Sequence, residues 1–555
     1  MPGICDPILP AARVDAMRRA GEWHDRLLID HVDETAAAAP DRDAVLAWDS
    51  VAGELATLNY QALVHRSRRI ALGLLGLGVQ PGDVVAFQLP NRWEFVALHL
   101  ACLRIGAVSN PLMPIFRERE LSFMLEFAQA RVLVVPDSFR GFSHAGLARE
   151  LQARLPHLEH VLVVDGTGGD AFERQILRRR WEDEFDAEAE FAARRAGPND
   201  VIQLLYTSGT TGRPKGVMHT SNTLLAGCAA YAQAAGLGPG TRCYMASPLA
   251  HQTGFMYGLM TPLMLGTSVL LQDIWDPATA WRLIGEHRLQ FTMGATPFLA
   301  DLTHAPDALP AGESPLDIFV CGGAPIPRVL AEEANARLGV RVVAAWGMSE
   351  CGVVTMTLPG DPEAKVFGTD GVALPGTEVR VVGADDAPLP AGEEGRLQTR
   401  GTFLFVGYLK KPDLYGVDGD GWFDTGDLAR MDDDGYVRIT GRAKDIIIRG
   451  GENIPVAELE DCLYRLPQVE DAAVVAMPDP RLGERACAFV TLRTGQALDL
   501  AALQAAFEAE GFARQYVPER LEVIEAMPRT ASGKIQKFEL RARLVPPAEE
   551  NASGS

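Results

Sequence analysis

Apolar residues recur along the chain in two alternating patterns. Short valine-rich runs at 132–135 and 161–164 are typical of buried strands. Between such runs, stretches such as 60–75 place apolar residues three or four positions apart, which indicates helices that bury one face. Strands that alternate with helices form parallel sheets covered by helices. We therefore expect an α/β body of helix-covered sheets that continues to about Met356.

The pattern changes twice in the last third of the chain. From Gly371 to Tyr408, short β-rich runs are broken by Gly and Pro, which predicts an antiparallel subdomain packed on the α/β body. After Gly441, helix and strand patterns alternate again over about a hundred residues, a normal size for a small domain. The expected parts are an N-terminal body over 1–441 with its β-rich part at 370–441, a small α+β domain over 442–545, and a polar, disordered tail over 546–555.

Three further stretches indicate whether the protein is secreted, inserted in a membrane or soluble. Residues 254–271 are the most membrane-like, but they contain Gly258 and Pro262 and lack flanking positive charge, so a buried core segment is expected. Residues 172–195 are dense in charge, which predicts a solvated amphipathic helix. Residues 1–13 lack the basic and apolar regions of a secretion signal. We expect a soluble, cytoplasmic protein without a transmembrane segment.

Composition narrows the classes of partner. The chain has 555 residues and a formal net charge of −21, so its surface repels nucleic acid on average and a duplex-binding role is not expected. The eight cysteines are scattered without Cys-x-x-Cys spacing, which leaves zinc and a disulfide framework unsupported. In so acidic a chain, single basic residues in glycine-rich loops are informative, because an anionic substrate needs local positive charge.

One polar loop lies between a buried apolar run at 201–205 and a helical pattern at 224–235. Glycines let backbone N–H groups converge, hydroxyls add donors and a lysine adds charge, a combination that suits a polyphosphate. The loop is not a Walker A sequence, because Pro214-Lys215-Gly216 replaces Gly-Lys-Ser/Thr. A polar surface loop is the alternative. The residues that would surround a phosphate are Thr207, Ser208, Gly209, Thr210, Thr211, Gly212 and Lys215.

Other candidate loops follow apolar runs. The small residues of Cys321-Gly322-Gly323-Ala324-Pro325 would let a flat ring approach the backbone, and a tight turn is the alternative. Trp346 could stack on a base and Glu350 could hold a hard cation; a core tryptophan and a surface glutamate are the alternatives. The segment 421–428 places two carboxylates in a glycine loop, and a carboxylate can accept from the vicinal hydroxyls of a ribose.

In order and spacing these segments resemble the adenylate-forming superfamily of acyl-CoA synthetases, peptide-synthetase adenylation domains and luciferases. The resemblance covers essentially the whole chain and extends to residues 441–445, 450–455 and 528–535. It implies that the N-terminal body binds ATP and a carboxylic acid, and that the small C-terminal domain is a mobile lid. The implied chemistry has two half-reactions. Acid and ATP give acyl-AMP and pyrophosphate, and coenzyme A then gives acyl-CoA and AMP.

The resemblance also implies roles for single residues. Charge that develops on the phosphoryl oxygens needs cations, which Lys534 and Mg²⁺ held by Glu350 would supply. Lys444 matches the hinge, and Gly450 and Gly451 would flank the coenzyme A channel. The family more often has Tyr where Trp346 stands and Thr where Ser349 stands. The implied catalytic residues are Lys534, His251 and Thr207; the implied nucleotide contacts are 207–212, Lys215, Gly323, Ala324, Pro325, Trp346, Gly347, Met348, Ser349, Asp427 at the ribose and Arg442 beside it.

The segment 248–255 resembles the acyl-pocket lining of CoA ligases. His251 would lie near the carboxylate or the thiol tunnel, and a structural histidine is the alternative. The Asp with which peptide-synthetase domains meet an amino group is missing, which disfavours an amino-acid substrate. The stretches 110–120 and 291–297 look most like medium-chain and alicyclic-acid CoA ligases, such as cyclohexanecarboxylate-CoA ligase. The implied acyl-pocket residues are His251, Gly254, Gly294, Gly322 and Gly347.

The expected function is therefore an ATP-dependent acid–CoA ligase that uses ATP, Mg²⁺ and coenzyme A on a medium-chain, alicyclic or aromatic acid. A 4-coumarate-type or short branched acid stays open, as do a homodimer and regulation by acetylation of Lys534. Because no carrier domain follows the lid, a free thiol acceptor is favoured. The alternatives are an adenylation domain that loads a carrier protein, a light-emitting oxygenase, and a non-catalytic nucleotide-binding homologue, against which Lys534, Glu350 and Asp427 argue.

Overall fold

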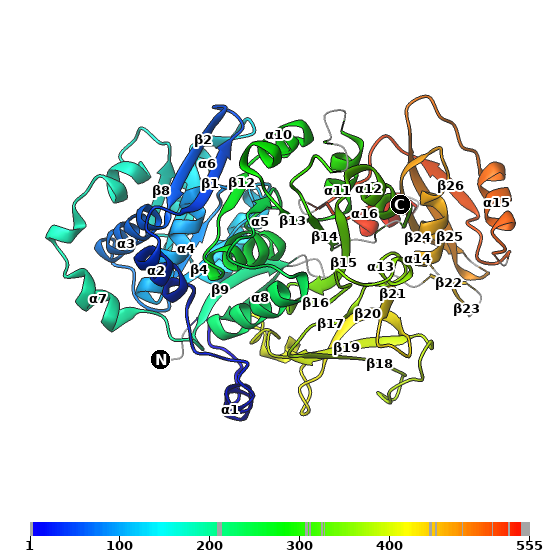
Figure 1. The fold of residues 1–555 in the computed structure, drawn as a ribbon, viewed down its shortest axis with the longest axis horizontal. Helices are drawn as coiled ribbons and strands as arrows, with labels where there is room; N and C mark the ends of the chain where they lie inside the picture. The colour runs from blue at the N-terminus through cyan, green and yellow to red at the C-terminus, as the bar shows by residue number, and fades with distance from the viewer. Residues whose placement is uncertain are drawn as a thin grey trace, which may run out of the picture.

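The computed structural model divides into an α/β body, a β-rich sheet below it and a small domain at the C-terminal end (Figure 1). The body combines parallel sheets with covering helices, as the alternating pattern predicts. The structure describes residues 4–544 apart from 208–213, 306–308, 310–311, 324–325, 327, 443–446, 450–451, 455, 480, 513 and 531–532, so the predicted tail lies outside the described residues.

One sheet of the body has six strands, in the order β10-β9-β4-β3-β5-β8. The strands β9, β4, β3, β5 and β8 run parallel, and β10 closes one edge antiparallel to β9. The strands are β3 (Val84–Phe87), β4 (Val108–Pro111), β5 (Val132–Pro136), β8 (His160–Val164), β9 (Val201–Thr207) and β10 (Lys215–Thr220). The helices of this part are α3 (Tyr60–Gly76), α4 (Trp93–Ile105), α5 (Glu118–Ala128), α6 (His144–Arg154) and α8 (Ser221–Ala235), and a hairpin joins β6 (Ser138–Phe139) to β7 (Phe142–Ser143).

The other sheet of the body has nine strands, in the order β17-β16-β15-β14-β13-β11-β12-β1-β2. Its six central strands, from β15 to β1, are parallel, and antiparallel strands close both edges. The strands are β1 (Asp43–Asp49), β2 (Glu54–Asn59), β11 (Cys243–Met245), β12 (Val269–Gln272), β13 (Phe291–Gly294), β14 (Ile318–Gly322), β15 (Arg341–Met348), β16 (Gly352–Met356) and β17 (Val372–Ala373). Further helices of the N-terminal part are α1 (Ala11–Arg19), α2 (Leu28–Ala38), α9 (Thr261–Met264), α10 (Pro277–His287), α11 (Thr296–His304), α12 (Arg328–Leu338) and α13 (Glu363–Val366).

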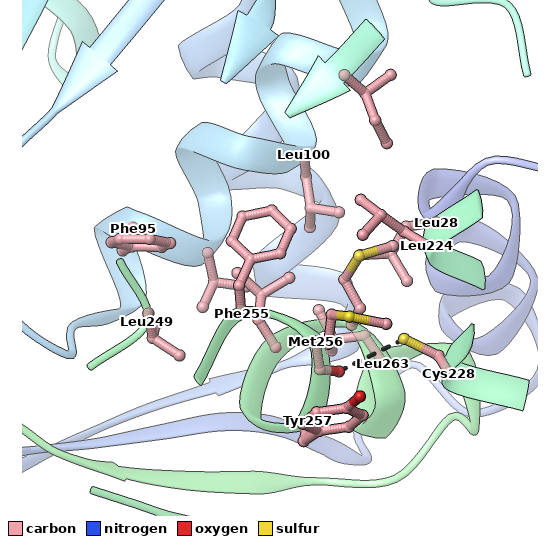
Figure 2. Packing of buried hydrophobic residues seen from close by; sticks show 14 of the residues in the cluster. Leu28, Phe95, Leu100, Leu224, Cys228, Leu249, Phe255, Met256, Tyr257 and Leu263 are labelled. Atoms are coloured by element: carbon pink, nitrogen blue, oxygen red, sulfur yellow. Dashed lines mark hydrogen bonds between the residues drawn. The ribbon is translucent and has the colours of Figure 1, made fainter. Parts of the chain in front are cut away.

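The largest apolar core lies between α4, α8 and a π-helical turn, η3 (Gly254–Met260) (Figure 2). Phe255 of η3 meets Phe95 of α4, and the Cys228 thiol of α8 donates to the Met256 carbonyl at 3.6 Å. Every residue of η3 is buried, so residues 254–260 form core as predicted. In the part of the chain that the structure covers, no helix has the length and apolar character needed to span a membrane.

The two predicted changes of pattern, after Gly371 and after Gly441, correspond to two further sheets. An antiparallel sheet holds β18 (Thr377–Val382), β19 (Gly395–Gly401), β20 (Phe423–Met431) and β21 (Val437–Arg442), with a short turn η4 (Pro412–Leu414) before β20. The C-terminal sheet holds β22 (Ile447–Arg449), β23 (Glu452–Ile454), β24 (Val469–Asp479), β25 (Gly483–Leu492) and β26 (Arg520–Val523), with helices α14 (Val456–Tyr464), α15 (Leu500–Ala509) and α16 (Lys537–Ala542).

The prediction of a single amphipathic helix over 172–195 is wrong. The segment forms three short pieces, η1 (Glu173–Leu177), η2 (Trp181–Asp183) and α7 (Ala187–Arg194). Trp181 is buried where a solvated helix would expose it. A Cβ placed on Gly76 of α3 would lie 2.1 Å from the Trp181 ring, so the missing side chain leaves the space that the indole fills.

Candidate active site

The predicted phosphate loop joins two paired strands. Thr207 at the end of β9 lies opposite Lys215 at the start of β10, so the two flanking residues are cross-strand partners. The loop itself, with Ser208, Gly209, Thr210, Thr211 and Gly212, lies outside the described residues. The helix predicted to follow is confirmed as α8, with Thr220 as its N-cap. The expectation that a polar loop fills the whole interval is wrong, because residues 215–220 pair with β9 and residues 216–220 are buried.

Glu350 is a buried carboxylate with a phenol partner. The Tyr408 hydroxyl donates to Glu350 Oε1 at 2.7 Å, and the Phe405 N–H donates to the Glu350 carbonyl at 2.7 Å. Burial and the negative charge of Glu350 raise the pKa of Tyr408, so the phenol keeps its proton. The Lys215 ammonium lies 4.8 Å from the centre of the Tyr408 ring, which links the phosphate loop to Glu350. Nothing in the sequence pattern singles out Tyr408, because 58 residues separate it from its partner.

Each carboxylate oxygen of Asp427 has a partner, a hydrogen-bond donor on one side and a guanidinium on the other. Trp346 Nε1 donates to Oδ2 at 2.9 Å, and Arg442 Nε lies 2.9 Å from Oδ1. Asp427 and Arg442 face each other on β20 and β21, so the glycine loop expected over 421–428 is wrong from Phe423 onward, where the chain is strand. The strand pairing fixes where the carboxylate points.

Lys534 reaches the body from the C-terminal domain. Its Cε lies 3.7 Å from the point that a Cβ on Gly323 would occupy, and Gly323 has a left-handed φ of +83°. A Cβ placed on the adjacent Gly533 would lie 3.5 Å from Pro297 Cγ, at the start of α11. Arg529 contacts both Asp471 and the Gly533 carbonyl, which shapes the loop before the lysine. The structure therefore brings Lys534 to the end of β14.

His251 is neutral in the folded protein. Burial and the positive charge of Lys534 lower its pKa to about 4. The Thr253 N–H donates to Nδ1 at 3.3 Å, so Nδ1 is an acceptor and the ring proton lies on Nε2. The imidazole can thus donate from Nε2.

Two family models match the chain. The model of the AMP-binding enzyme matches residues 32–409, and that of the AMP-binding enzyme C-terminal domain matches residues 458–534. This chain belongs to the AMP-binding enzyme family. The matched ranges contain Lys215, Glu350 and, in the C-terminal model, Lys534.

Relatives of known name span nearly the full chain of this AMP-binding enzyme. It is 40% identical to the medium-chain fatty-acid–CoA ligase of Escherichia coli (strain K12), over 96% of this chain and 92% of that protein. It is 35% identical to the salicylyl-CoA synthase / salicylate adenylyltransferase of a Streptomyces species, over 96% of each. Among solved structures, ATP-bound MatB from Rhodopseudomonas palustris is similar at a TM-score of 0.79 and 27% identity, over 92% of this chain and 98% of that one.

The comparisons confirm the predicted adenylate-forming superfamily and its two-part fold. They also confirm the predicted enzyme class, an AMP-forming acyl-CoA synthetase that uses ATP, Mg²⁺ and coenzyme A. The fine assignment of site residues rests on the geometry above and stays a prediction. Of the predicted set, Ala324, Pro325, Lys444, Gly450 and Gly451 also lie outside the described residues.

The donor set around Glu350 suits Mg²⁺ that arrives with a nucleotide. No group of three or more His, Cys, Asp or Glu side chains that could cage a metal occurs among the residues with described positions. Mg²⁺ commonly uses one or two carboxylates, waters and substrate phosphates instead of an all-protein cage. Glu350 Oε1 accepts from Tyr408, which leaves Oε2 for a cation. The residues present therefore fit the family's metal.

The glycines predicted to line the acyl pocket are required by close backbone packing. A Cβ on Gly347 would lie 2.0 Å from the Gly352 carbonyl, and one on Gly254 would lie 2.2 Å from the Pro248 carbonyl. On Gly322 it would lie 2.7 Å from the Ala345 carbonyl. These positions exclude larger residues whether or not an acid binds beside them. The remaining predicted residues follow the same strands: Gly294 ends β13, Met348 ends β15, and the Ser349 carbonyl lies 2.8 Å from His219 Nε2.

Proposed function

We propose that this enzyme joins a medium-chain, alicyclic or aromatic acid to coenzyme A through an acyl-adenylate. The observation that carries the proposal is the approach of Lys534 to Gly323, beside the strand that holds Trp346. Lys534 of the C-terminal domain then lies at the end of β14, next to the strand whose Trp346 donates to Asp427. That arrangement suits a reaction that builds negative charge on a phosphoryl group.

Each group has a chemical task in the proposed first step. A thiol cannot displace oxide from a carboxylate, so the acid oxygen bonds to the α-phosphorus of ATP and the bond to pyrophosphate breaks. Lys534 would donate to the oxygens that gain charge, and Asp427 would accept from the ribose hydroxyls. Mg²⁺ held by Glu350 would neutralise charge on the phosphates. Neutral His251 would donate from Nε2 to the acid.

The second step needs a different lid position. The thiol sulfur of coenzyme A attacks the acyl carbonyl, the C–S bond forms, the C–O bond to AMP breaks, and the thiol proton is released. Lys534 would obstruct this approach, so the lid must turn about the hinge proposed at Lys444. Gly450 and Gly451 would then flank the path of the thiol. These three residues lie outside the described part of the chain.

The similarity to a medium-chain fatty-acid ligase and to a salicylyl-CoA synthase supports an apolar acid. A second candidate is transfer to a carrier protein in place of free coenzyme A. The 2,3-dihydroxybenzoate-AMP ligase of Bacillus subtilis (strain 168), 32% identical over 96% of each chain, is named for the adenylate step without coenzyme A, which leaves room for another acceptor. We also propose a cytoplasmic location and leave a homodimer as a further proposal.

The test is pyrophosphate release across straight-chain, alicyclic and aromatic acids, with and without coenzyme A. The proposal expects release with an apolar acid and conversion of that acid to its CoA thioester. Acyl transfer to a phosphopantetheinylated carrier protein, with little transfer to coenzyme A, would establish the second candidate instead. No acid-dependent release across the panel would contradict both.

A further inference from the structure

An ion pair joins the body to the lid. Arg438 Nη2 on β21 lies 2.8 Å from Asp461 Oδ2 on α14, and α14 packs along β21 (Figure 1). Both side chains are largely shielded, with exposed fractions of 26% for Arg438 and 17% for Asp461. A contact between two domains breaks when one domain turns, so this pair exists in the lid position seen here.

The same guanidinium has a second carboxylate within reach. Arg438 Nη1 lies 3.9 Å from Asp370 Oδ2, and Asp370 belongs to the body. Burial raises the pKa of Asp370, and the charge of Arg438 opposes that shift. A small cavity lined by Arg438, Asp370, Thr369 and Phe367 lies beside the guanidinium. Arg438 therefore lies between Asp461, which would move away with the lid, and Asp370, which would remain beside it in the body.

A second ion pair connects α14 to the segment after Lys534. Glu460, the neighbour of Asp461, is buried and accepts from the Val474 N–H at 2.7 Å. Its Oε1 also lies 2.7 Å from the ammonium of Lys537, the first residue of α16. Because α14 is tied to α16 in this way, holding α14 against the body also holds the loop that carries Lys534.

We propose that Arg438 is a positioning residue for adenylate formation. Paired with Asp461 it holds the lid so that Lys534 lies at Gly323, and as the lid turns it exchanges Asp461 for Asp370. The exchange lowers the cost of leaving the first lid position, because the guanidinium is paired in both. This inference rests on the proposed function, since only a two-step reaction needs two lid positions.

The first test separates the two half-reactions. In Asp461→Asn, which removes the lid-side partner of Arg438 and leaves Asp370 in place, pyrophosphate release should fall about tenfold, the size of a shielded charge pair, while thioester formation from supplied acyl-AMP stays within about twofold. Arg438→Met removes the guanidinium from both lid positions and should slow both steps, and Arg438→Lys should recover most of the first one. The matched control is Arg430→Met, because Arg430 is the cross-strand partner of Arg438 and pairs with Glu394 within the body at 3.7 Å. Equal loss of both steps in Asp461→Asn, or a loss in Arg430→Met as large as that in Arg438→Met, would overturn the proposal.

Asp370→Asn should affect the second half-reaction and spare the first. It removes the second partner of Arg438 and keeps an acceptor for the Ile439 N–H, which lies 2.8 Å from Asp370 Oδ2. Pyrophosphate release should stay within about twofold, and thioester formation from acyl-AMP should slow about threefold to tenfold. A purely structural role for Asp370 would slow both steps together, and that outcome would contradict the exchange.

A distance measurement makes the outcome independent of activity. Spin labels at Leu414→Cys in the body and Val523→Cys in the lid would use two exposed positions, and the eight native cysteines are buried. Arg438→Met should broaden the distance distribution relative to the labelled parent, and Arg430→Met should not. If the distribution of distances between the labels is unchanged in Arg438→Met, the inference is overturned, whatever the rate of pyrophosphate release. A protein without acid-dependent release would fail the proposed function and leave this measurement valid.

Discussion

The indole N–H of Trp346 donates to Asp427 at 2.9 Å, across 81 positions of sequence. Arg442 occupies the other oxygen of the same carboxylate. Asp427 is almost fully buried, so these two partners set its orientation. Trp346 thus has a task that its predicted stacking on a base does not include: it aims the carboxylate proposed to hold the ribose.

Trp346→Phe tests this task, because it keeps an aromatic face and removes the donor. A hydrogen bond to a charged group contributes about 1.5–3 kcal/mol, so the KM for ATP should rise roughly tenfold to a hundredfold. The KM for the acid should change by no more than about twofold. Pyrophosphate release at varied ATP and varied acid gives both constants. A larger change for the acid than for ATP would place Trp346 in the acyl pocket instead.

Tyr408→Phe removes the hydroxyl that holds Glu350. A freed carboxylate can turn away from the site proposed for Mg²⁺, so half-maximal activity should need about three to ten times more Mg²⁺, in line with one lost hydrogen bond. Titration of Mg²⁺ at fixed ATP measures the shift. Tyr436→Phe is the control, since its hydroxyl donates to Asp361 at 2.8 Å in another part of the body. An unchanged Mg²⁺ requirement in Tyr408→Phe would remove Tyr408 from the site.

Buried neutral histidines should make the fold sensitive to acid. Burial lowers the pKa of His99 to about 3 and that of His219 to about 4. The unfolded chain takes up protons near the ordinary value of 6.5, whereas the folded chain does not, so stability falls as the pH drops below about 6.5. At pH 5 each residue should cost about 2 kcal/mol. His99→Gln should flatten the decline of the unfolding midpoint between pH 7 and pH 5. A decline as steep as in the parent would show that His99 is protonated in the folded state.

Gly347→Ala distinguishes packing from pocket lining. The added Cβ would lie 2.0 Å from the Gly352 carbonyl, so overpacking should cost about 3 kcal/mol and lower the thermal midpoint. Gly441→Ala is the matched control, because a Cβ there meets nothing within 4 Å. A Gly347→Ala protein with the parent's midpoint and a raised KM for the acid would mean that the glycine serves only the pocket.

Local pattern predicted the elements whose own residues determine them. The helix expected over 60–75 is α3 (Tyr60–Gly76), and the valine-rich runs at 132–135 and 161–164 are β5 and β8. Each of these has a repeat that matches its own geometry and a buried face that is continuous along the chain. The change of pattern after Gly371 could also be predicted from local residues, because Gly and Pro interrupt the β-rich runs there.

Pairing between distant segments was not visible in the sequence. Residues 215–220 follow a Gly- and Pro-containing loop, and only the presence of β9 beside them makes them a strand. The Tyr408–Glu350 and Arg438–Asp461 contacts likewise depend on which strands and helices become neighbours. The order and spacing of the motifs identified the candidate site residues. The structure shows the partners that hold Asp427 and Glu350.

Lys534→Ala is the most direct test of the account, with acyl-AMP formation and thioester formation measured separately on the same protein. Acid-dependent pyrophosphate release should fall about a thousandfold, a typical loss for a charge-stabilising group, while supplied acyl-AMP is still converted to its CoA thioester at about the parent rate. Equal loss of both half-reactions, or full adenylation without the ammonium group, would contradict it.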